Sequence, residues 1–315
     1  MVRTEITRSQ YRREGMRYES DTTDDEWLVM EPLLPRASAL RRPRETDMRA
    51  LVNAILYIAS TGCQWRQLPK EFPPYSTVQG YFYAWSRDGT FALLNHALVL
   101  ASREAAGREA SPTAGVIDSQ SVKTTESGGP RGYDAGKKIK GRKRHIVTDT
   151  QGNLVGLVVH EASIQDRDGA PCVLASIRSL YPWLRHIFAD GGYAGEKLRQ
   201  ALKRMGEWTI EIIKRSDTAQ GFEVLPRRWV VERTFAWLGR CRRLAKDLKR
   251  PSPAPLHGRS SLTSASSRVA SQGLEIKWNH FESDTEELVS FITDTRRAVV
   301  SPMNTSAVRC FRRGR

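Results

Sequence analysis

The sequence has few cysteines and no long apolar run, and each absence argues against a class of protein. Its 4 cysteines lie far apart and form no Cys-x-x-Cys pair, so neither a disulfide scaffold nor a zinc ribbon is expected, and a reducing cytoplasm fits. No stretch approaches the ~18 apolar residues of a membrane-spanning helix, because Asn53 and Asn95 interrupt the longest ones. Residues 1–20 are polar and charged, without the apolar centre of a secretory signal, and no membrane partner is expected.

Acidic residues are scarce relative to basic ones. The chain has 50 Lys and Arg against 35 Asp and Glu, which gives a formal net charge of +15 and an isoelectric point near 10.0. Such a charge predicts a polyanionic partner, most simply nucleic acid. The alternative is a globular protein that is basic without such a partner. Hydrophobic residues make up 39% of the chain, which is enough for a packed core, so a disordered chain is not expected.

The N-terminal third has helical periodicity. Residues 1–21 alternate basic and acidic side chains and are expected to form a flexible arm. Residues 22–110 space their apolar side chains as helices do. The expected helices begin after Thr23 or Asp24, span 46–60, begin with Ser76 as cap, and span 90–106. We therefore expect an all-α region here.

From residue 111 onward, strands are expected to alternate with helices. The expected strands cover 114–118, 145–149, 154–160, 186–190 and 208–213, and the expected helices cover 166–179, 194–205 and 227–249. This alternation predicts an α/β domain with one mixed sheet over residues 111–250. Residues 251–315 begin with a proline cluster and continue into a serine-rich run, so a poorly ordered tail is expected.

Two aspartates at predicted strand ends and one glutamate on a predicted helix are the candidate chemical centre. Asp118 and Asp190 each follow a short apolar run, and Glu232 lies among apolar residues of the long basic helix. Carboxyl ends of strands carry functional groups in open sheets, so these side chains are expected to converge. Three such carboxylates suit two Mg²⁺ ions roughly 3.5–4 Å apart, which support phosphoryl transfer. The alternative is a set of turn caps and a solvated salt bridge.

Segments around these carboxylates resemble the catalytic blocks of bacterial insertion-sequence DDE transposases of the four/five group. They read Val-Ile-Asp118-Ser-Gln-Ser-Val, Phe-Ala-Asp190-Gly-Gly-Tyr-Ala-Gly and Trp-Val-Val-Glu232-Arg-Thr-Phe-Ala-Trp-Leu. The stretches 132–145 and 162–168 are similar to the same family, and so is the N-terminal stretch 25–69. The similarity covers about residues 22–250, with the motifs in the order that the family has them.

The resemblance implies an RNase H-like fold, a divalent metal (Mg²⁺ or Mn²⁺, two ions), and cleavage and joining of DNA. The implied partners are double-stranded DNA, as terminal inverted repeats and as target, and further copies of the chain on that DNA. By the same resemblance, Asp118, Asp190 and Glu232 are the metal-binding catalytic residues. Relatives continue past the last helix with apolar helical sequence, whereas Pro251 and the serine-rich run stand here, so an altered C-terminal end is expected.

Basic residues supply the predicted DNA contacts. Six of the eight residues 137–144 are basic and are expected in a loop near the site, and further arginines follow on the Glu232 helix. The residues predicted to contact DNA are Lys137, Lys138, Lys140, Arg142, Lys143, Arg144, Arg228, Arg233 and Arg240. The alternative for residues 137–144 is a solvated loop without a fixed partner.

Several features have two interpretations on sequence alone. The helix from Ser76 either reads the major groove of DNA or packs its aromatic side chains in a helical bundle. His145 and His160 are expected to be structural, and Asp166 and Asp168 to be favourable N-terminal residues of a helix rather than ligands. Two other functions also stay open: an RNase H-like nuclease that cuts without joining, and a catalytically inactive DNA-binding relative.

Overall fold

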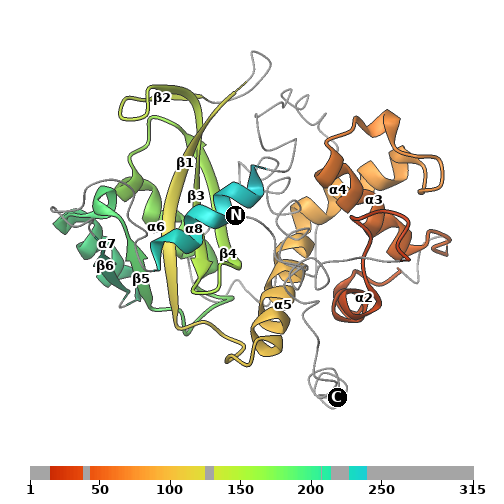
Figure 1. Ribbon diagram of the computed structural model, residues 1–315, viewed down its shortest axis with the longest axis horizontal. Coiled ribbons are helices and arrows are strands. Elements are labelled where there is room, and N and C mark those ends of the chain that lie inside the picture. The colour runs from red at the N-terminus through yellow and green to blue at the C-terminus, as the bar shows by residue number, and fades with distance from the viewer. Residues whose placement is uncertain (1–14, 38–42, 125–130, 207, 214–226, 240–315) are drawn as a thin grey trace, which may run out of the picture.

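The molecule has a helical region and a mixed β-sheet, with one long helix between them (Figure 1). The computed structural model describes residues 15–37, 43–124, 131–206, 208–213 and 227–239. The first 14 residues of the predicted arm, the predicted helix beyond residue 239 and the predicted tail 251–315 lie outside the described residues. Among the helices that are described, none is long and apolar enough to cross a membrane.

The first helices begin and end where their capping residues predict. In α2 (Asp24–Met30), Thr23 and Glu26 form a reciprocal capping box, which selects Thr23 over Asp24 as the cap. A short 3₁₀ turn, η1 (Glu31–Leu33), follows. In α3 (Met48–Thr61), the Asp47 carboxylate accepts two backbone N–H groups, and Gly62 ends the helix with a φ of 70°. The expected helix over 46–60 is therefore confirmed within two residues at its start.

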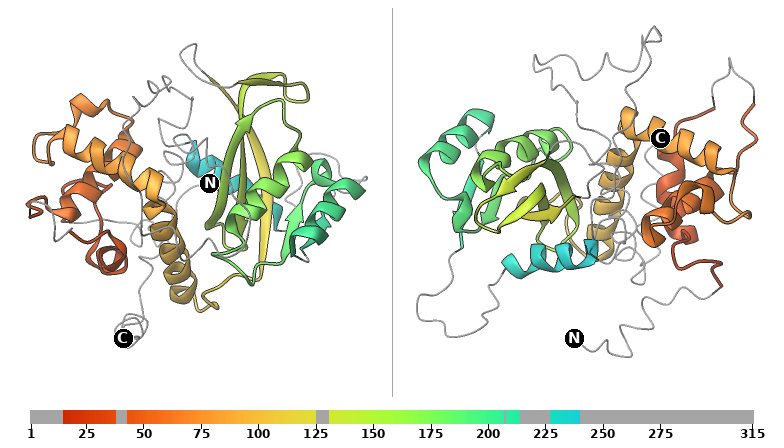
Figure 2. Two further views of the ribbon diagram at one scale, coloured as in Figure 1. Left: turned by 180° about the vertical axis from the view of Figure 1, so that it is seen from behind. Right: turned by 90° about the horizontal axis from the view of Figure 1, so that it is seen from above.

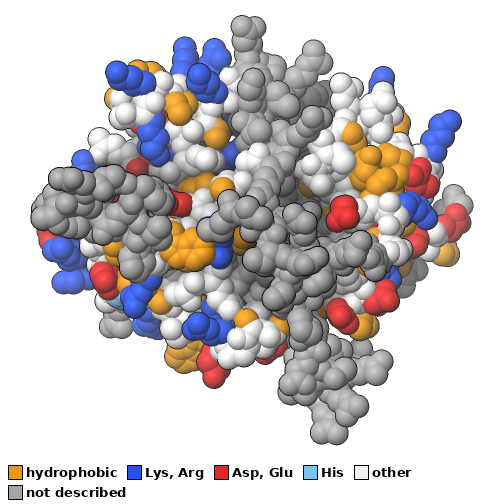
Figure 3. Space-filling model, in the orientation of Figure 1, with side chains coloured by type: hydrophobic (Ala, Val, Ile, Leu, Met, Phe, Trp, Pro, Cys, Tyr) orange, Lys and Arg blue, Asp and Glu red, His pale blue; other side chains and the backbone are white. Residues whose placement is uncertain are grey.

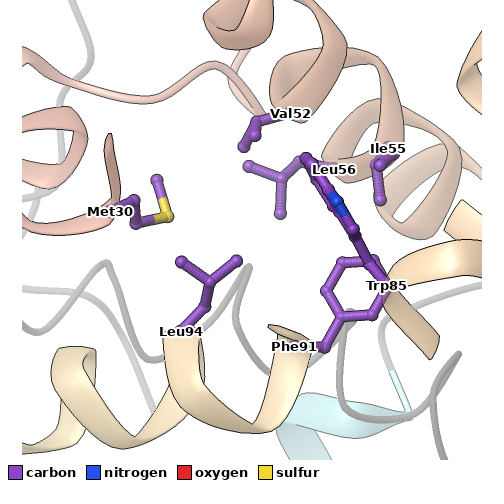
Figure 4. Close-up of a pocket in the computed structure, with 7 residues that line it drawn as sticks. All are labelled: Met30, Val52, Ile55, Leu56, Trp85, Phe91 and Leu94. Atoms are coloured by element: carbon purple, nitrogen blue, oxygen red, sulfur yellow. The ribbon is translucent and has the colours of Figure 1, made fainter. Parts of the chain in front are cut away.

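Helix α4 (Tyr75–Asp88) follows the 3₁₀ turn η2 (Trp65–Gln67) and packs its aromatic side chains inside the bundle. Pro74 stands at its N-cap and no side chain caps it, so the predicted capping by Ser76 is wrong. Phe82 and Trp85 are buried, as bundle packing predicts. Residues from α2 to α5 line a small apolar cavity in this core: Met30, Val52, Ile55, Leu56, Trp85, Phe91 and Leu94 (Figure 4).

The sheet is mixed, as predicted, and contains six strands among the described residues. They are β1 (Ala114–Lys123), β2 (Gly132–Asp134), β3 (Ile139–Asp149), β4 (Leu154–Glu161), β5 (His186–Ala189) and β6 (Thr209–Ile212). The order is β2-β3-β1-β5-β6, and β4 also pairs with β3. The β1–β3, β2–β3 and β3–β4 pairs are antiparallel, whereas β1–β5 and β5–β6 are parallel. This arrangement is an RNase H-like α/β fold.

Two strands are longer than their apolar residues predict. β1 continues for five residues past Asp118, so Asp118 lies in the middle of the strand and not at its end. β3 begins at Ile139, so most of the basic stretch expected in a loop is strand. The added parts pair with each other, for example Ser121 with Lys143. They were missed because they carry polar residues on both faces instead of an apolar alternation.

Helices cover both faces of the sheet (Figure 2). On one face, α6 (Asp166–Ile177) packs Val173 and Leu174 against Ile117 of β1, and α7 (Glu196–Gly206) joins the same core. On the other face, α8 (Arg228–Leu238) packs Val231 and Phe235 against Val116. Neighbouring residues of β1 thus enter opposite cores, as the pleat of a strand requires.

Helix α5 (Thr90–Ala105) connects the two regions. Its Leu94 and Leu98 belong to the helical core, and its Val99 belongs to the core under α6. The Asn95 amide donates to the Leu154 carbonyl of β4 at 2.9 Å. A buried ion pair of 2.7 Å joins Arg103 to Asp149 at the end of β3. The helix is therefore a structural part of both regions.

The segment 15–21 lies against the helical region. The Tyr18 ring centroid is 4.7 Å from that of Tyr57 and 5.4 Å from that of Phe72, and Ser20 and Asp21 are buried. The predicted domain boundaries stay predictions, but these contacts place the end of the predicted arm on the bundle.

Candidate active site

The register of β1 and β5 brings Asp118 and Asp190 together. The last pair of these parallel strands is Val116 with Phe188, and each aspartate stands two residues further along. Because side chains alternate along a strand, the aspartates face the same side as Val116 and Phe188, which pack against α8. The structure therefore places both predicted carboxylates on the α8 face, although Asp118 is not at a strand end.

A backbone N–H group orients each aspartate. The Asp118 carboxylate accepts the N–H of Ser119 at 2.7 Å, and the Asp190 carboxylate accepts the N–H of Gly192 at 2.8 Å. The second bond caps the 3₁₀ turn η3 (Gly191–Tyr193). Burial, together with the nearby charge of Asp190, raises the pKa of Asp118 to about 6. Asp118 thus lacks sufficient positive charge around it.

Arg228 connects the remaining predicted carboxylate to Asp190. Its Nη2 atom lies 3.6 Å from Glu232 Oε1, one turn along α8, and 3.8 Å from Asp190 Oδ2. The Arg228 charge also lowers the pKa of Asp118 against the larger effect of burial. The guanidinium therefore lies between Asp190 and Glu232, and its charge also acts on Asp118. Glu232 itself is half exposed, beside the buried Val231 that fixes α8 on the sheet.

The chemistry of these donors fits a hard divalent cation, because carboxylate oxygens are the ligands that Mg²⁺ and Mn²⁺ prefer. Asp118 is a partly buried carboxylate with a raised pKa, and a bound cation would compensate its charge. As the side chains stand, however, the described residues contain no group of three His, Cys, Asp or Glu placed to hold one ion. Arg228 lies between Asp190 and Glu232 instead.

The α6 face of β1 carries a second polar cluster that the sequence analysis missed. The Asp166 carboxylate accepts the Ser119 hydroxyl at 2.7 Å and the Lys143 ammonium at 2.9 Å. Lys143 also lies 3.3 Å from Asp134, which accepts the Ser121 hydroxyl at 2.6 Å. The sequence predicts for Asp166 only a favourable place at the helix N-terminus. The available signal was the unexplained polar alternation Ser119, Ser121 after the first strand.

The basic residues predicted to contact DNA differ in exposure. Lys137, Lys138 and Lys140 are exposed near β2, where Lys and Arg side chains gather at the upper left of Figure 3. By contrast, the side chains that follow in β3 are buried: Arg142, Lys143 and Arg144. Strand pairing on both edges of β3 accounts for this burial. Their DNA contacts stay predictions.

The predicted DNA contacts on α8 have protein partners in the structure. Arg228 is 18% exposed and is ion-paired to two carboxylates. The Arg233 guanidinium stacks between Trp229 and Trp237 at 4.5 and 4.6 Å, and it donates to the Gln151 carbonyl. This contact fixes α8 on the β3–β4 turn. Arg240 lies outside the described residues.

His145 has the structural place expected of it. Its ring is fully buried, 5.0 Å from the ring of His160, and burial lowers its pKa to about 3. A β-carbon on Gly169 would stand 2.5 Å from this ring, so only glycine allows α6 to approach the sheet this closely.

Fold and site together define the chain as an RNase H-like α/β protein with an acidic centre at neighbouring strands. Two family models match it in succession. Residues 22–95 match "Putative transposase of IS4/5 family (DUF4096)", and residues 109–254 match "Transposase DDE domain". The chain belongs to the IS4/5-type DDE transposases.

Two curated relatives are similar over shorter stretches. The "Putative transposase for insertion sequence element IS402" of Burkholderia cepacia is 37% identical over 126 residues, 38% of this chain and 57% of that protein. The "Uncharacterized protein y4sN" of Sinorhizobium fredii (strain NBRC 101917 / NGR234) is 30% identical over 82 residues, 26% of this chain and 63% of that protein. The chain thus spans about 60% of the length of these relatives.

Proposed function

We propose that this chain binds the terminal inverted repeats of an insertion sequence and catalyses metal-dependent cleavage and strand transfer of DNA. Asp118, Asp190 and Glu232 are its catalytic residues. The observation that carries the proposal is the shared register of Asp118 and Asp190 on the α8 face, with Arg228 between Asp190 and Glu232. A DDE transposase domain implies the use of a divalent metal in general.

The three carboxylates would hold two Mg²⁺ or Mn²⁺ ions, which when bound activate a water or 3′-hydroxyl and stabilise the leaving oxygen. The protein's own groups orient this set. The Ser119 and Gly192 N–H groups orient the two aspartates, and Arg228 supplies positive charge beside Asp190 that would stabilise a phosphate bound there. Val231 and Phe235, buried against the sheet, hold α8 and with it Glu232.

Positive charge near β2 supports the DNA partner. Lys137, Lys138 and Lys140 are exposed there, and the chain as a whole carries a net charge of +15. Contacts to phosphates would make the affinity fall steeply with salt. We propose that the protein acts as a homo-oligomer on inverted-repeat and target DNA in the bacterial cytoplasm.

The test is incubation of the full chain with DNA carrying its own element's ends, with and without Mg²⁺ or Mn²⁺. Nicked and joined products are expected, and Asp118→Ala, Asp190→Ala and Glu232→Ala should each reduce them to background while leaving DNA binding intact. Asp168→Ala is the matched control, because Asp168 pairs with Lys197 at 2.8 Å, away from the α8 face.

Other products separate the alternatives. Nicking without a joined product would indicate a nuclease, and DNA binding without nicking would indicate an inactive relative. Cleavage by Asp190→Ala at the wild-type rate would exclude the catalytic assignment.

A further inference from the structure

Asp166 lies beside both segments that carry the proposed catalytic aspartates. It lies at the start of α6, on the opposite face of the sheet from α8. Its carboxylate accepts the hydroxyl of Ser119, which follows Asp118 directly, and lies beside Gly192, two residues after Asp190. The proposed mechanism assigns Asp166 no role, so its place between the two segments needs an explanation.

The contact with Ser119 acts on Asp118 through one residue. The Ser119 hydroxyl donates to Asp166 Oδ1 at 2.7 Å, and the Ser119 carbonyl accepts the Lys137 ammonium at 3.0 Å. The N–H of the same residue donates to the Asp118 carboxylate at 2.7 Å. Because Ser119 is buried and held on both its hydroxyl and its carbonyl, the direction of its N–H is fixed.

On the Asp190 side, the Asp166 carboxylate is a close neighbour of Gly192, whose N–H orients Asp190. A β-carbon on Gly192 would stand 3.4 Å from Asp166 Oδ2 and 3.0 Å from Asp190 Oδ1, so the two carboxylates flank this glycine. The Gly192 N–H donates to Asp190 at 2.8 Å. Tyr193, 1% exposed, belongs to the same turn, and burial, together with the charges of Asp118, Asp166 and Asp190, raises its pKa.

Lys143 fixes Asp166 itself. The Lys143 side chain is 6% exposed, and its ammonium lies 2.9 Å from Asp166 Oδ1 and 3.3 Å from Asp134 Oδ2. Asp134 is held in turn by the Ser121 hydroxyl and the Lys137 N–H. The Asp166 carboxylate is therefore part of a network that joins α6 to β1, β2 and β3, and it has little freedom to rotate.

We propose that Asp166, held by Lys143, is a positioning residue that sets the separation of Asp118 and Asp190 by binding Ser119 and by lying beside Gly192. The inference rests on the proposed function, because it concerns the same two aspartates. It also gives Lys143 a role inside the protein in place of the predicted DNA contact. Residues that orient metal-binding side chains commonly change metal affinity or activity roughly 10- to 100-fold when they are replaced.

The experiment compares Asp166→Asn with Asp168→Asn in the full chain. Both remove one negative charge from the first turn of α6, but only Asp166 contacts Ser119. Binding of Mn²⁺ alone, followed by calorimetry, should weaken at least about 10-fold in Asp166→Asn and stay unchanged in Asp168→Asn. The affinity for inverted-repeat DNA and its salt dependence should match the wild type in both, because neither residue contacts phosphate in the proposal.

A pair of serine variants keeps the test valid if Asp166→Asn does not fold. Ser119→Thr retains the hydroxyl that donates to Asp166 and should bind Mn²⁺ as the wild type does. Ser119→Ala removes it and should show the weakened binding. Equal Mn²⁺ affinity in all four variants overturns the proposal, and so does weakened binding in Asp168→Asn equal to that in Asp166→Asn.

Failure of the proposed function has a different signature. If the wild type binds Mn²⁺ no better than Asp118→Ala does, the metal assignment of the α8 face fails, and the positioning role fails with it. If the wild type binds Mn²⁺ and Asp118→Ala does not, the comparison of Asp166→Asn with Asp168→Asn decides the positioning role alone.

Discussion

The carboxylates on the two sides of β1 have pKa values shifted in opposite directions. On the α6 face, burial disfavours ionised Asp134, but hydrogen bonds from Ser121, the Lys137 N–H and Lys143 outweigh it and lower its pKa to about 2. On the α8 face, burial dominates at Asp118 and raises its pKa to about 6. On one side, β1 thus contacts a cluster in which Lys143 balances the charges of Asp134 and Asp166. On the other side, it carries Asp118, whose charge is not balanced in this way.

This difference shows how an acidic site can have a fixed backbone and still favour a bound cation. On the α6 face, Lys143 lies 2.9 Å from Asp166 and 3.3 Å from Asp134, and these short contacts restrain the strands that carry the site. On the α8 face, Arg228 makes longer contacts, 3.6 Å to Glu232 and 3.8 Å to Asp190, so the negative charge there is only partly balanced. A cation is therefore favoured on the α8 face and has nothing to neutralise on the α6 face.

The largest effect is expected from Lys143→Met, which removes the positive charge from the cluster on the α6 face. Removing the ammonium leaves the buried Asp134 and the partly buried Asp166 without their shared partner, and loss of one member of a buried pair costs about 3–5 kcal/mol of unfolding free energy. Urea denaturation at pH 7 measures it. Lys140→Met, at an exposed position of the same strand, should stay within about 0.5 kcal/mol of the wild type. Equal stability of the two variants would refute the buried-pair role of Lys143.

A stabilising effect is expected from Asp118→Asn, which removes the unbalanced negative charge from the α8 face. Because folding raises the pKa of Asp118 from 3.8 to about 6, native stability falls as the pH rises through that interval. The asparagine keeps an acceptor for the Ser119 N–H without the charge. At pH 7 without metal, the variant should gain about 2 kcal/mol. Thermal denaturation from pH 4 to pH 7 should show this gain growing with pH, and a loss of stability at pH 7 would contradict the assignment.

The opposite sign is expected from Asp134→Asn. Folding lowers the pKa of Asp134 from 3.8 to about 2, so its contribution is present above pH 4 and is lost as the pH falls through 2. At pH 7 the variant should lose roughly 1–2 kcal/mol, and the loss should shrink on acidification. Paired denaturation curves at pH 7 and pH 2.5 measure the difference. A stabilised Asp134→Asn protein would show that the two faces do not differ.

The smallest effect is expected at the exposed lysines, where the comparison extends to DNA binding. The double variant Lys138→Gln, Lys140→Gln should flatten the slope of log affinity against log salt by roughly 0.9 for each phosphate that these lysines neutralise in the wild type. Lys143→Gln, if folded, should leave the slope unchanged, because that ammonium is buried between two carboxylates. Filter binding on inverted-repeat DNA between 50 and 200 mM salt, roughly the range in which such slopes are measured, separates the two. Equal slopes in both variants would return Lys143 to the set of residues that bind DNA.

The sequence predicted most elements because their signals are local. The Thr23 and Asp47 caps, the Gly62 terminator and the apolar runs of 145–149 and 186–189 each predict an element from a few neighbouring residues. The three-residue β2 and the polar halves of β1 and β3 have no such signal. The three-residue β2 forms only by pairing with β3, and the polar halves of β1 and β3 depend on pairing between segments about 20 residues apart, as for Ser121 with Lys143.

For the site, the sequence indicates three acidic residues, whose catalytic role stays a prediction, but it does not indicate the residues that surround them. Asp118, Asp190 and Glu232 stand in motifs that identify them, and the strand register brings the two aspartates together. Asp166 and Lys143 were assigned to a helix start and to a DNA surface, because a charged residue is normally exposed. The burial of Lys143 and its contact with Asp166 depend on β3 being paired on both edges and on the close approach of α6 at Gly169, which no short window of sequence contains.

Helix α5 has a consequence for any attempt to divide the protein. A fragment that ends at residue 110 would keep α5 but expose Val99, which the sheet now buries. A fragment that begins at residue 111 would lose Arg103 and leave Asp149, whose carboxylate is fully buried, without its cation. Both halves would be damaged by the same cut, so the helical region and the sheet are expected to melt in a single transition, as one cooperative unit.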